Sequence, residues 1–263
     1  MASSGKTPKG TPPRRAGTAA VLVVGCVAGL VACGQGEGSA TALDAATRAL
    51  PASTQPGTAS ATPTASSAEP TPTGPPAFTS SVSKVTRDLL RYSWRPGCPV
   101  PLSDLRLVKL TYWGFDDRAH TGELVVRDTV TDDVQTIFKR LYAQRYPIYR
   151  MRLVDVYKGD DFDSIDADNT SAFNCRPATG SSSWSKHAYG EAIDINPREN
   201  PYRHADGTVE HENAREFARR PLDRPGVVNA GDRVVRTFAA FGWEWGGSWA
   251  GTKDFQHFSK GGG

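Results

Sequence analysis

The chain has 263 residues, of which 38% are hydrophobic and 22% are charged, and its formal net charge is +3. The first 33 residues contain four cations and no acid, which leaves 27 basic and 28 acidic residues in the rest of the chain. Because the positive excess is confined to this N-terminal segment, the charge gives no support for binding to nucleic acid.

Residues 1–33 have the pattern of an export signal. Four cations precede an apolar run that ends in Leu-Val-Ala-Cys at Cys33. This run is too short for a comfortable membrane span, and a basic start with small residues at the end is typical of a secretory signal. Its last four residues resemble the lipobox of bacterial lipoproteins, in which the cysteine is lipidated. We therefore expect Cys33 to anchor the protein to the outer face of the bacterial cell membrane. A plain secretory signal or an uncleaved anchor is the alternative.

Residues 34–77 consist mainly of Ala, Thr, Ser, Pro and Gly, and residues 51–76 contain a single charge, Glu69. A segment with so little to bury is predicted to be a disordered tether. At about 3 Å per residue, the proline-rich part would reach on the order of 80 Å when extended. The folded domain is therefore predicted at residues 78–263.

Two cysteines are left for this domain, because Cys26 lies in the signal and Cys33 is assigned to the lipid. In an exported protein, the remaining pair, Cys98 and Cys175, predicts one disulfide. A catalytic thiol is the weaker alternative, since neither cysteine has a local partner motif.

The domain combines strand and helix patterns without regular alternation. Thr131 is placed to cap the first helix and Pro147 to stop it. In chain order, the predicted elements are strands at 105–112 and 122–127, a helix at 134–142, a strand at 148–157, and helices at 210–219 and 232–241. This order indicates an α+β domain with a central antiparallel sheet and flanking helices.

Two short segments supply the residue types of a catalytic zinc site: His187, Asp194, Asp254 and His257. Ile193 and Ile195 flank Asp194, which predicts a buried strand. A buried carboxylate must be paired or bound to metal. A metal shared with His187 meets this need, and Gly190 allows the turn between the two residues.

In the second segment, Asp254 lies three residues before His257, after a loop rich in glycine and tryptophan. If His257 is the third ligand, Asp254 can face the fourth position, where water binds. The residues themselves therefore indicate metal-assisted hydrolysis.

The two segments resemble the zinc D-alanyl-D-alanine carboxypeptidases and related peptidoglycan peptidases, whose fold is shared with the hedgehog signalling domain. The family pattern Ser-x-His-x-x-Gly-x-Ala-x-Asp is matched by Ser185, His187, Gly190, Ala192 and Asp194. Its second element, an acid three residues before a histidine after a Trp-Gly-Gly turn, is matched by Trp245, Gly246, Gly247, Asp254 and His257. The likeness covers residues 169–258, and two motifs in the right order make it specific.

The resemblance implies one catalytic zinc ion, with His187, Asp194 and His257 as ligands and Asp254 as general base. The implied substrate is the stem peptide of peptidoglycan, and removal of its terminal D-alanine is the expected reaction. The alternatives are an endopeptidase cut elsewhere in the stem and a non-catalytic cell-wall-binding lipoprotein. We expect a monomer.

The expected substrate contacts are less closely defined. Arg176 lies where such enzymes place an arginine that receives a substrate carboxylate, and Arg150 and Arg152 compete with it for that role. Ser185 and Trp245 are further expected contacts. The tryptophans near the C-terminus either wall the cleft or belong to the core.

The other histidines and acids receive simpler interpretations. His204 and His211 are expected at the surface, because no second histidine forms a HExxH motif with His211. The acidic run at 160–168 lacks the glycine and the closing glutamate of a calcium loop. It is therefore expected to be a solvated loop without a ligand.

Overall fold

The computed structural model describes residues 74–262. The predicted signal peptide, the lipidation site Cys33 and the tether as far as residue 73 lie outside these residues. In the described part of the chain, no helix has the length and apolar character needed to cross a membrane.

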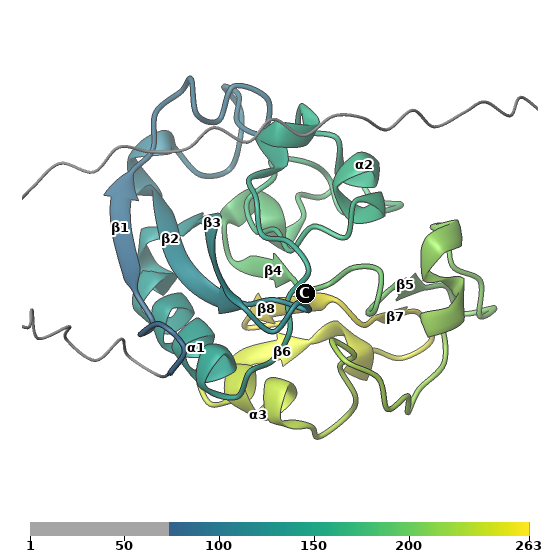
Figure 1. The fold of residues 1–263 in the computed structure, drawn as a ribbon. Coiled ribbons are helices and arrows are strands. Elements are labelled where there is room, and N and C mark those ends of the chain that lie inside the picture. The colour runs from purple at the N-terminus through teal and green to yellow at the C-terminus, as the bar shows by residue number, and fades with distance from the viewer. Residues whose placement is uncertain (1–73, 263) are drawn as a thin grey trace, which may run out of the picture. The chain divides into compact units, whose positions relative to one another are not determined.

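Within residues 74–262 the strands form three small antiparallel sheets, which follow one another from left to right in Figure 1. The first has the order β1-β2-β3, the second β4-β8-β6 and the third β5-β7. Their strands are β1 (Ser80–Lys84), β2 (Leu105–Trp113), β3 (Ala119–Arg127), β4 (Ala192–Asp194), β5 (Tyr202–Arg203), β6 (Trp243–Trp245), β7 (Lys253–Asp254) and β8 (His257–Lys260). The α+β class with antiparallel pairing is confirmed, but the single central sheet is replaced by three separate ones.

The second sheet is short because its first strand cannot continue past the site. β4 pairs with β8 from Ala192 to Asp194, and Ile195 still donates its N–H to the carbonyl of Gln256. Asn196 then takes a left-handed conformation with φ 45°, and Pro197 follows. A non-glycine residue at positive φ followed by proline is incompatible with an extended strand.

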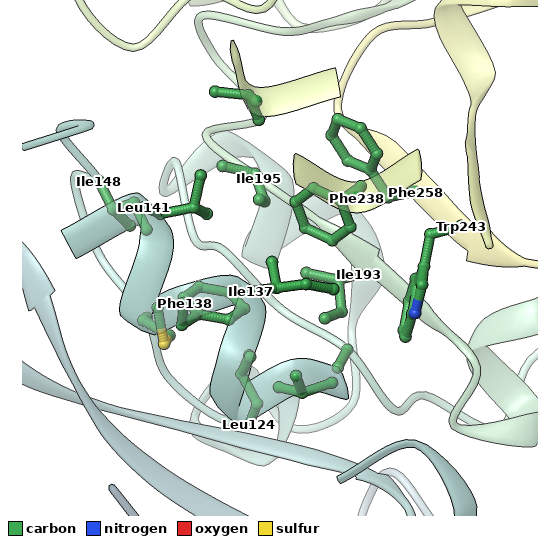
Figure 2. Close-up of a cluster of buried hydrophobic side chains, with 14 of the residues drawn as sticks. Leu124, Ile137, Phe138, Leu141, Ile148, Ile193, Ile195, Phe238, Trp243 and Phe258 are labelled. Carbon is green, nitrogen blue, oxygen red and sulfur yellow. The ribbon is translucent and has the colours of Figure 1, made fainter. Parts of the chain in front are cut away.

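The main core lies between α1 (Thr131–Ala143), α3 (Arg233–Ala239) and the strands of the first two sheets. The apolar residues of α1 at helical spacing are buried, and Ile137 extends toward Ile193 of β4 (Figure 2). On the other side, the Phe238 ring of α3 stacks on Phe258 of β8, with ring centroids 4.0 Å apart. The core therefore fixes β4 and β8, the two strands that end at Asp194 and begin at His257.

The predicted disulfide between Cys98 and Cys175 is present in the structure, with the two Cα atoms 5.9 Å apart. It belongs to a second apolar cluster that includes Leu90, Leu105 and Phe173. The Arg95 guanidinium also donates a hydrogen bond of 2.7 Å to the carbonyl of Cys175. The chain just before Arg176 is thus attached to the segment that precedes β2.

The predicted strand at 148–157 is wrong. Its backbone groups form hydrogen bonds with three different segments: Ile148 with Trp113, Met151 with Glu123, and Arg150 with Thr170. No single strand therefore pairs with this segment. The end of the segment, Val154–Tyr157, is a 3₁₀ turn.

The predicted helix at 210–219 is also only a 3₁₀ segment, Glu212–Phe217. Its buried residues, Ala214 and Phe217, lie three apart, which matches the three-residue period of a 3₁₀ helix. The helix predicted at 232–241 is α3, and the Asp232 carboxylate accepts a hydrogen bond of 2.9 Å from the N–H of Val235 at its start.

Three smaller expectations need correction. Thr131 is the first residue of α1 rather than its cap, and its hydroxyl donates to the carbonyl of Asp128. The acidic run contains a short helix, α2 (Asp161–Asp166), because the Asp160 carboxylate caps it by accepting from the N–H of Asp163. His211 is 8% exposed rather than a surface residue, since its ring stacks on Phe162.

Candidate metal centre

His187 is positioned by a 3₁₀ turn, Lys186–Tyr189, whose two ends are both fixed. At the start, the Ser185 hydroxyl accepts a hydrogen bond of 3.3 Å from the N–H of His187. At the end, Gly190 has φ 68°, and a Cβ there would lie 2.6 Å from the backbone nitrogen of Arg127. Only glycine combines this left-handed conformation with so close an approach, as the sequence predicts.

The His187 ring has a defined orientation. Its Nδ1 donates a hydrogen bond of 2.6 Å to the carbonyl oxygen of Ala172, which leaves Nε2 of the neutral imidazole with a free lone pair. Nε2 lies 3.1 Å from Oδ2 of Asp194 and 3.2 Å from Nδ1 of His257. Such a bond to the far nitrogen is how metal-ligating histidines are usually held.

Asp194 and His257 are brought together by strand pairing. They are directly opposite each other in the β4–β8 register, and Nδ1 of His257 lies 3.1 Å from Oδ1 of Asp194. All three side chains are enclosed, because His187 is 3% exposed, Asp194 3% and His257 5%.

The surroundings shift the pKa values of the three side chains so that Asp194 is ionised and His257 is neutral. Burial would raise the pKa of Asp194, but the two imidazoles, His187 first, lower it far below its usual range. Burial lowers the pKa of His257, although Asp194 opposes this shift. For His187, burial is outweighed by Asp194, so that its pKa is raised. Asp194 thus favours a positive charge at Nε2 of His187, and a bound metal ion would take the place of the proton there.

The geometry fits a single metal ion. One ligand atom from each of the three residues lies within 4.8 Å of the others. Tetrahedral zinc ligands at the usual bond lengths are about 3.4 Å apart. Here the two imidazole nitrogens are 3.2 Å apart, and each lies 3.1 Å from one of the two oxygens of Asp194. Two imidazoles and one carboxylate also form a donor set typical of catalytic zinc, with a fourth position left for water or substrate.

Asp254 lies beside this group on β7, and it is 9% exposed. Within residues 74–262 its Oδ1 atom has no hydrogen-bond partner. Burial and then repulsion from Asp194 raise the pKa of Asp254 well above its usual value, with His187 and Arg176 opposing the rise. A bound divalent cation favours the ionised form of a nearby carboxylate. Asp254 is therefore expected to be ionised when a metal ion is bound.

The turn before Asp254 approaches it closely. A Cβ at Gly246 would lie 2.6 Å from the carbonyl oxygen of Asp254 and 2.9 Å from its Cβ. The Trp-Gly-Gly element of the sequence motif thus has a steric reason, because a side chain at Gly246 would displace Asp254 and crowd His257.

A cavity of about 310 Å³, which we term the first hollow, opens onto the site. Its lining includes His187, His257 and Asp254 together with Arg176 and Ser185, two of the expected substrate contacts.

The competing arginines, Arg150 and Arg152, line a separate cavity of about 530 Å³ that contains none of the four predicted centre residues. Trp245 needs a correction, since it is 5% exposed and packs in the main core, where its indole N–H donates to the carbonyl of Phe255. Trp249 lines the first hollow instead.

Sequence reasoning missed several residues of this cavity. Trp184 precedes the first motif and Tyr189 lies within it, but no residue pattern distinguished these two lining residues from core aromatics. Tyr202 lies directly opposite Asp254 in the two-residue pairing of β5 with β7. A strand pairing of two residues is too short to produce a periodic pattern in the sequence, so the position of Tyr202 could not be predicted.

A buried histidine–aspartate–histidine group with a second carboxylate beside it, at the base of a cavity, is the arrangement of a mononuclear metallohydrolase. Residues 179–260 match the family model described as D-alanyl-D-alanine carboxypeptidase, which supports the family resemblance of the two motifs. This segment contains all four predicted residues of the centre. No curated protein and no solved structure matches the chain.

Proposed function

We propose that this protein is a zinc peptidase that hydrolyses the stem peptides of peptidoglycan. The observation that carries the proposal is the enclosed group of His187, Asp194 and His257, with the Asp254 carboxylate at the same cavity and its Oδ1 atom without a partner in the described residues. The family match supports the peptidase class, and the substrate comes from the family likeness. The hedgehog-type fold is part of the same proposal.

His187, Asp194 and His257 would hold the zinc ion. When bound, zinc polarises a scissile carbonyl and lowers the pKa of its water ligand. The bond from His187 to the Ala172 carbonyl keeps the ring turned toward the ion. Asp194 supplies the negative charge that makes this enclosed position favourable for a cation.

Asp254 acts as general base. In its ionised form, it accepts a proton from the attacking water and passes it to the departing amine. Its enclosed position strengthens this step, because few waters compete for the carboxylate.

Around the centre, the cavity walls orient the substrate. Tyr202 and Trp249 exclude water from the first hollow, and the Ser185 hydroxyl is available beside His187. Arg176 lines the same space, and its guanidinium can donate to a carbonyl oxygen of the peptide.

We propose that the enzyme works outside the cell, attached through a lipid on Cys33 and a tether at residues 34–77. The basic and apolar pattern of residues 1–33 supports export. The disulfide between Cys98 and Cys175 is also consistent with an oxidising compartment. Metabolic labelling with a lipid precursor tests the anchor, and a Cys33→Ser protein should lose the label.

Metal analysis of the purified full-length chain tests the centre itself. We expect about one zinc per chain, and His187→Ala should lower this occupancy strongly. His204→Ala is the matched control, because His204 lies in the β5–β7 region but outside the lining of the first hollow. A His187→Ala protein that retains a full equivalent of zinc contradicts the ligand assignment.

Mass spectrometry of stem peptides incubated with the enzyme tests the reaction. The mass that is lost identifies the bond, and Asp254→Asn should bind zinc but release no product. Asp206→Asn, at an exposed turn, is the control that should keep full activity. If no stem peptide is cut, the protein is a cell-wall-binding module and the enzymatic proposal is wrong.

A further inference from the structure

The candidate base, Asp254, lies between two cavities, whereas His187 and His257 border only the first. A second hollow of about 210 Å³ adjoins the first and includes Phe162, Glu210 and His211 in its lining. Both hollows share Arg176, Thr179, Tyr202 and Asp254 as common walls.

The position of Asp254 makes this arrangement relevant to the reaction. Asp254 lines both hollows, while His187 and His257 line only the first. A peptide bond held next to Asp254 and the two histidines therefore has a cavity on each side. An enzyme that removes only a terminal residue needs a closed pocket with a counter-charge at the end of the chain.

Arg176 is the guanidinium expected to supply that counter-charge, but it already has an acidic partner. Its Nη2 atom lies 2.8 Å from Oδ2 of Asp161, and both side chains are mostly enclosed, with exposed fractions of 22% and 29%. Asp161 also lines the second hollow. A free substrate carboxylate would have to displace Asp161 or remain beside it, and two carboxylates on one guanidinium repel each other.

The second hollow is itself unfavourable for an anion. Glu210 lines it in addition to Asp161. The Phe162 ring, which is 53% exposed, stacks on the His211 ring with centroids 4.2 Å apart and provides an apolar surface. Such a surface fits a neutral continuation of the peptide chain better than a charged chain end.

From these observations we propose that the enzyme cuts internal peptide bonds, with the substrate chain continuing past Asp254 into the second hollow. Asp161 is the specificity residue, because it neutralises Arg176 and so removes the preference for a free C-terminal carboxylate. This inference rests on the proposed peptidase function and replaces terminal D-alanine release with an endopeptidase reaction. In the reaction, water adds its oxygen to the scissile carbonyl carbon, the C–N bond breaks, and the amine leaves with a proton.

Three synthetic stem peptides test the proposal in the full-length zinc enzyme. One ends in D-alanyl-D-alanine with a free carboxylate, one carries a C-terminal carboxamide, and one is extended by two residues. We expect kcat/KM for the amide and the extended peptide to equal or exceed that for the free acid. A preference for the free acid overturns the inference but leaves the peptidase function intact. Absence of cleavage in all three overturns both.

Asp161→Asn isolates the specificity residue. With Arg176 released, kcat/KM for the free acid should rise roughly tenfold, the size of a charge-assisted bond to carboxylate. The value for the amide should not change. Asp163→Asn, on the exposed side of the same helix, is the matched control, and Asp161→Glu should restore the wild-type ratio. An unchanged ratio in a folded Asp161→Asn protein contradicts the proposed role of Asp161.

A binding measurement separates this specificity from catalysis. In an Asp254→Asn background, tryptophan fluorescence can follow peptide binding, because Trp184 and Trp249 line the first hollow. The free acid and the amide should bind with equal affinity, and Asp161→Asn should strengthen binding of the free acid alone. Tighter binding of the free acid before that substitution would show that Arg176 is available, which contradicts the proposal.

Discussion

Removal of the disulfide is the perturbation whose effect on stability follows most directly from the structure. Cys98 and Cys175 are 77 residues apart in the sequence, so their bond closes a long loop. In the chain-entropy model, opening a loop of this length in the unfolded state costs the protein about 4.5 kcal/mol of stability. A double Cys98→Ser, Cys175→Ser protein should therefore unfold at a temperature roughly 9–18 °C lower, given 2–4 °C per kcal/mol for a domain of this size.

Circular dichroism during heating of the full-length chain measures this change. A reducing agent should lower the unfolding temperature of the wild type by a similar amount and leave the double variant unaffected. Below its unfolding temperature, the variant should still turn over peptide. The Cys175 N–H donates to the Ser93 carbonyl and the Arg95 guanidinium donates to the Cys175 carbonyl, and neither bond needs the sulfur atoms. An unfolding temperature that changes by less than about 3 °C would refute the loop-closure argument.

Three further substitutions address the centre, the pH dependence and the core. Gly246→Ala should lower turnover by about a hundredfold, because the new Cβ would press on Asp254, and wild-type kinetics would contradict the close approach. Burial and then repulsion from Asp168 raise the pKa of Glu199 from 4.5 to about 8. Between about pH 5 and pH 8, Glu199 therefore keeps its proton in the folded state but loses it in the unfolded state. The free energy of unfolding should fall as the pH rises through this range. Glu199→Gln should flatten that dependence in thermal unfolding at several pH values, and an unchanged slope would exclude Glu199 as its source. Ile193→Ala should lower the free energy of unfolding in urea by about 2–5 kcal/mol, since Ile193 is fully buried, and a loss below about 1 kcal/mol would contradict its place in the core.

The candidate centre was predictable because each of its residues has a local reason in the sequence. The apolar neighbours of Asp194 indicate a buried strand, and Gly190 indicates the turn back from His187. The structure has both features, with Asp194 at the end of β4 and Gly190 at φ 68°. In both cases the functional side chain and the residues that determine its backbone conformation lie within a few residues of each other in the sequence.

Predictions failed where partners come from distant segments. The residues at 148–157 have strand composition, yet their hydrogen bonds go to three neighbours and no sheet forms. Trp245 and Trp249 lie in the same segment rich in glycine and tryptophan, but Trp245 packs in the core whereas Trp249 lines the first hollow. Asp161 belongs to a run that looks solvated, and its pairing with Arg176 depends on tertiary contacts. Composition gives propensity, whereas these outcomes are decided by packing.

Two of the candidate ligands and the candidate base lie in different sheets. Asp194 and His257 belong to the second sheet, which is packed between α1 and α3, whereas Asp254 lies on a two-stranded ribbon with Tyr202. Changes in the core should therefore reduce zinc affinity together with stability. A change in the ribbon, such as Tyr202→Ala, should reduce turnover while zinc occupancy is retained. Parallel loss of both properties in Tyr202→Ala would show that the two sheets are mechanically coupled.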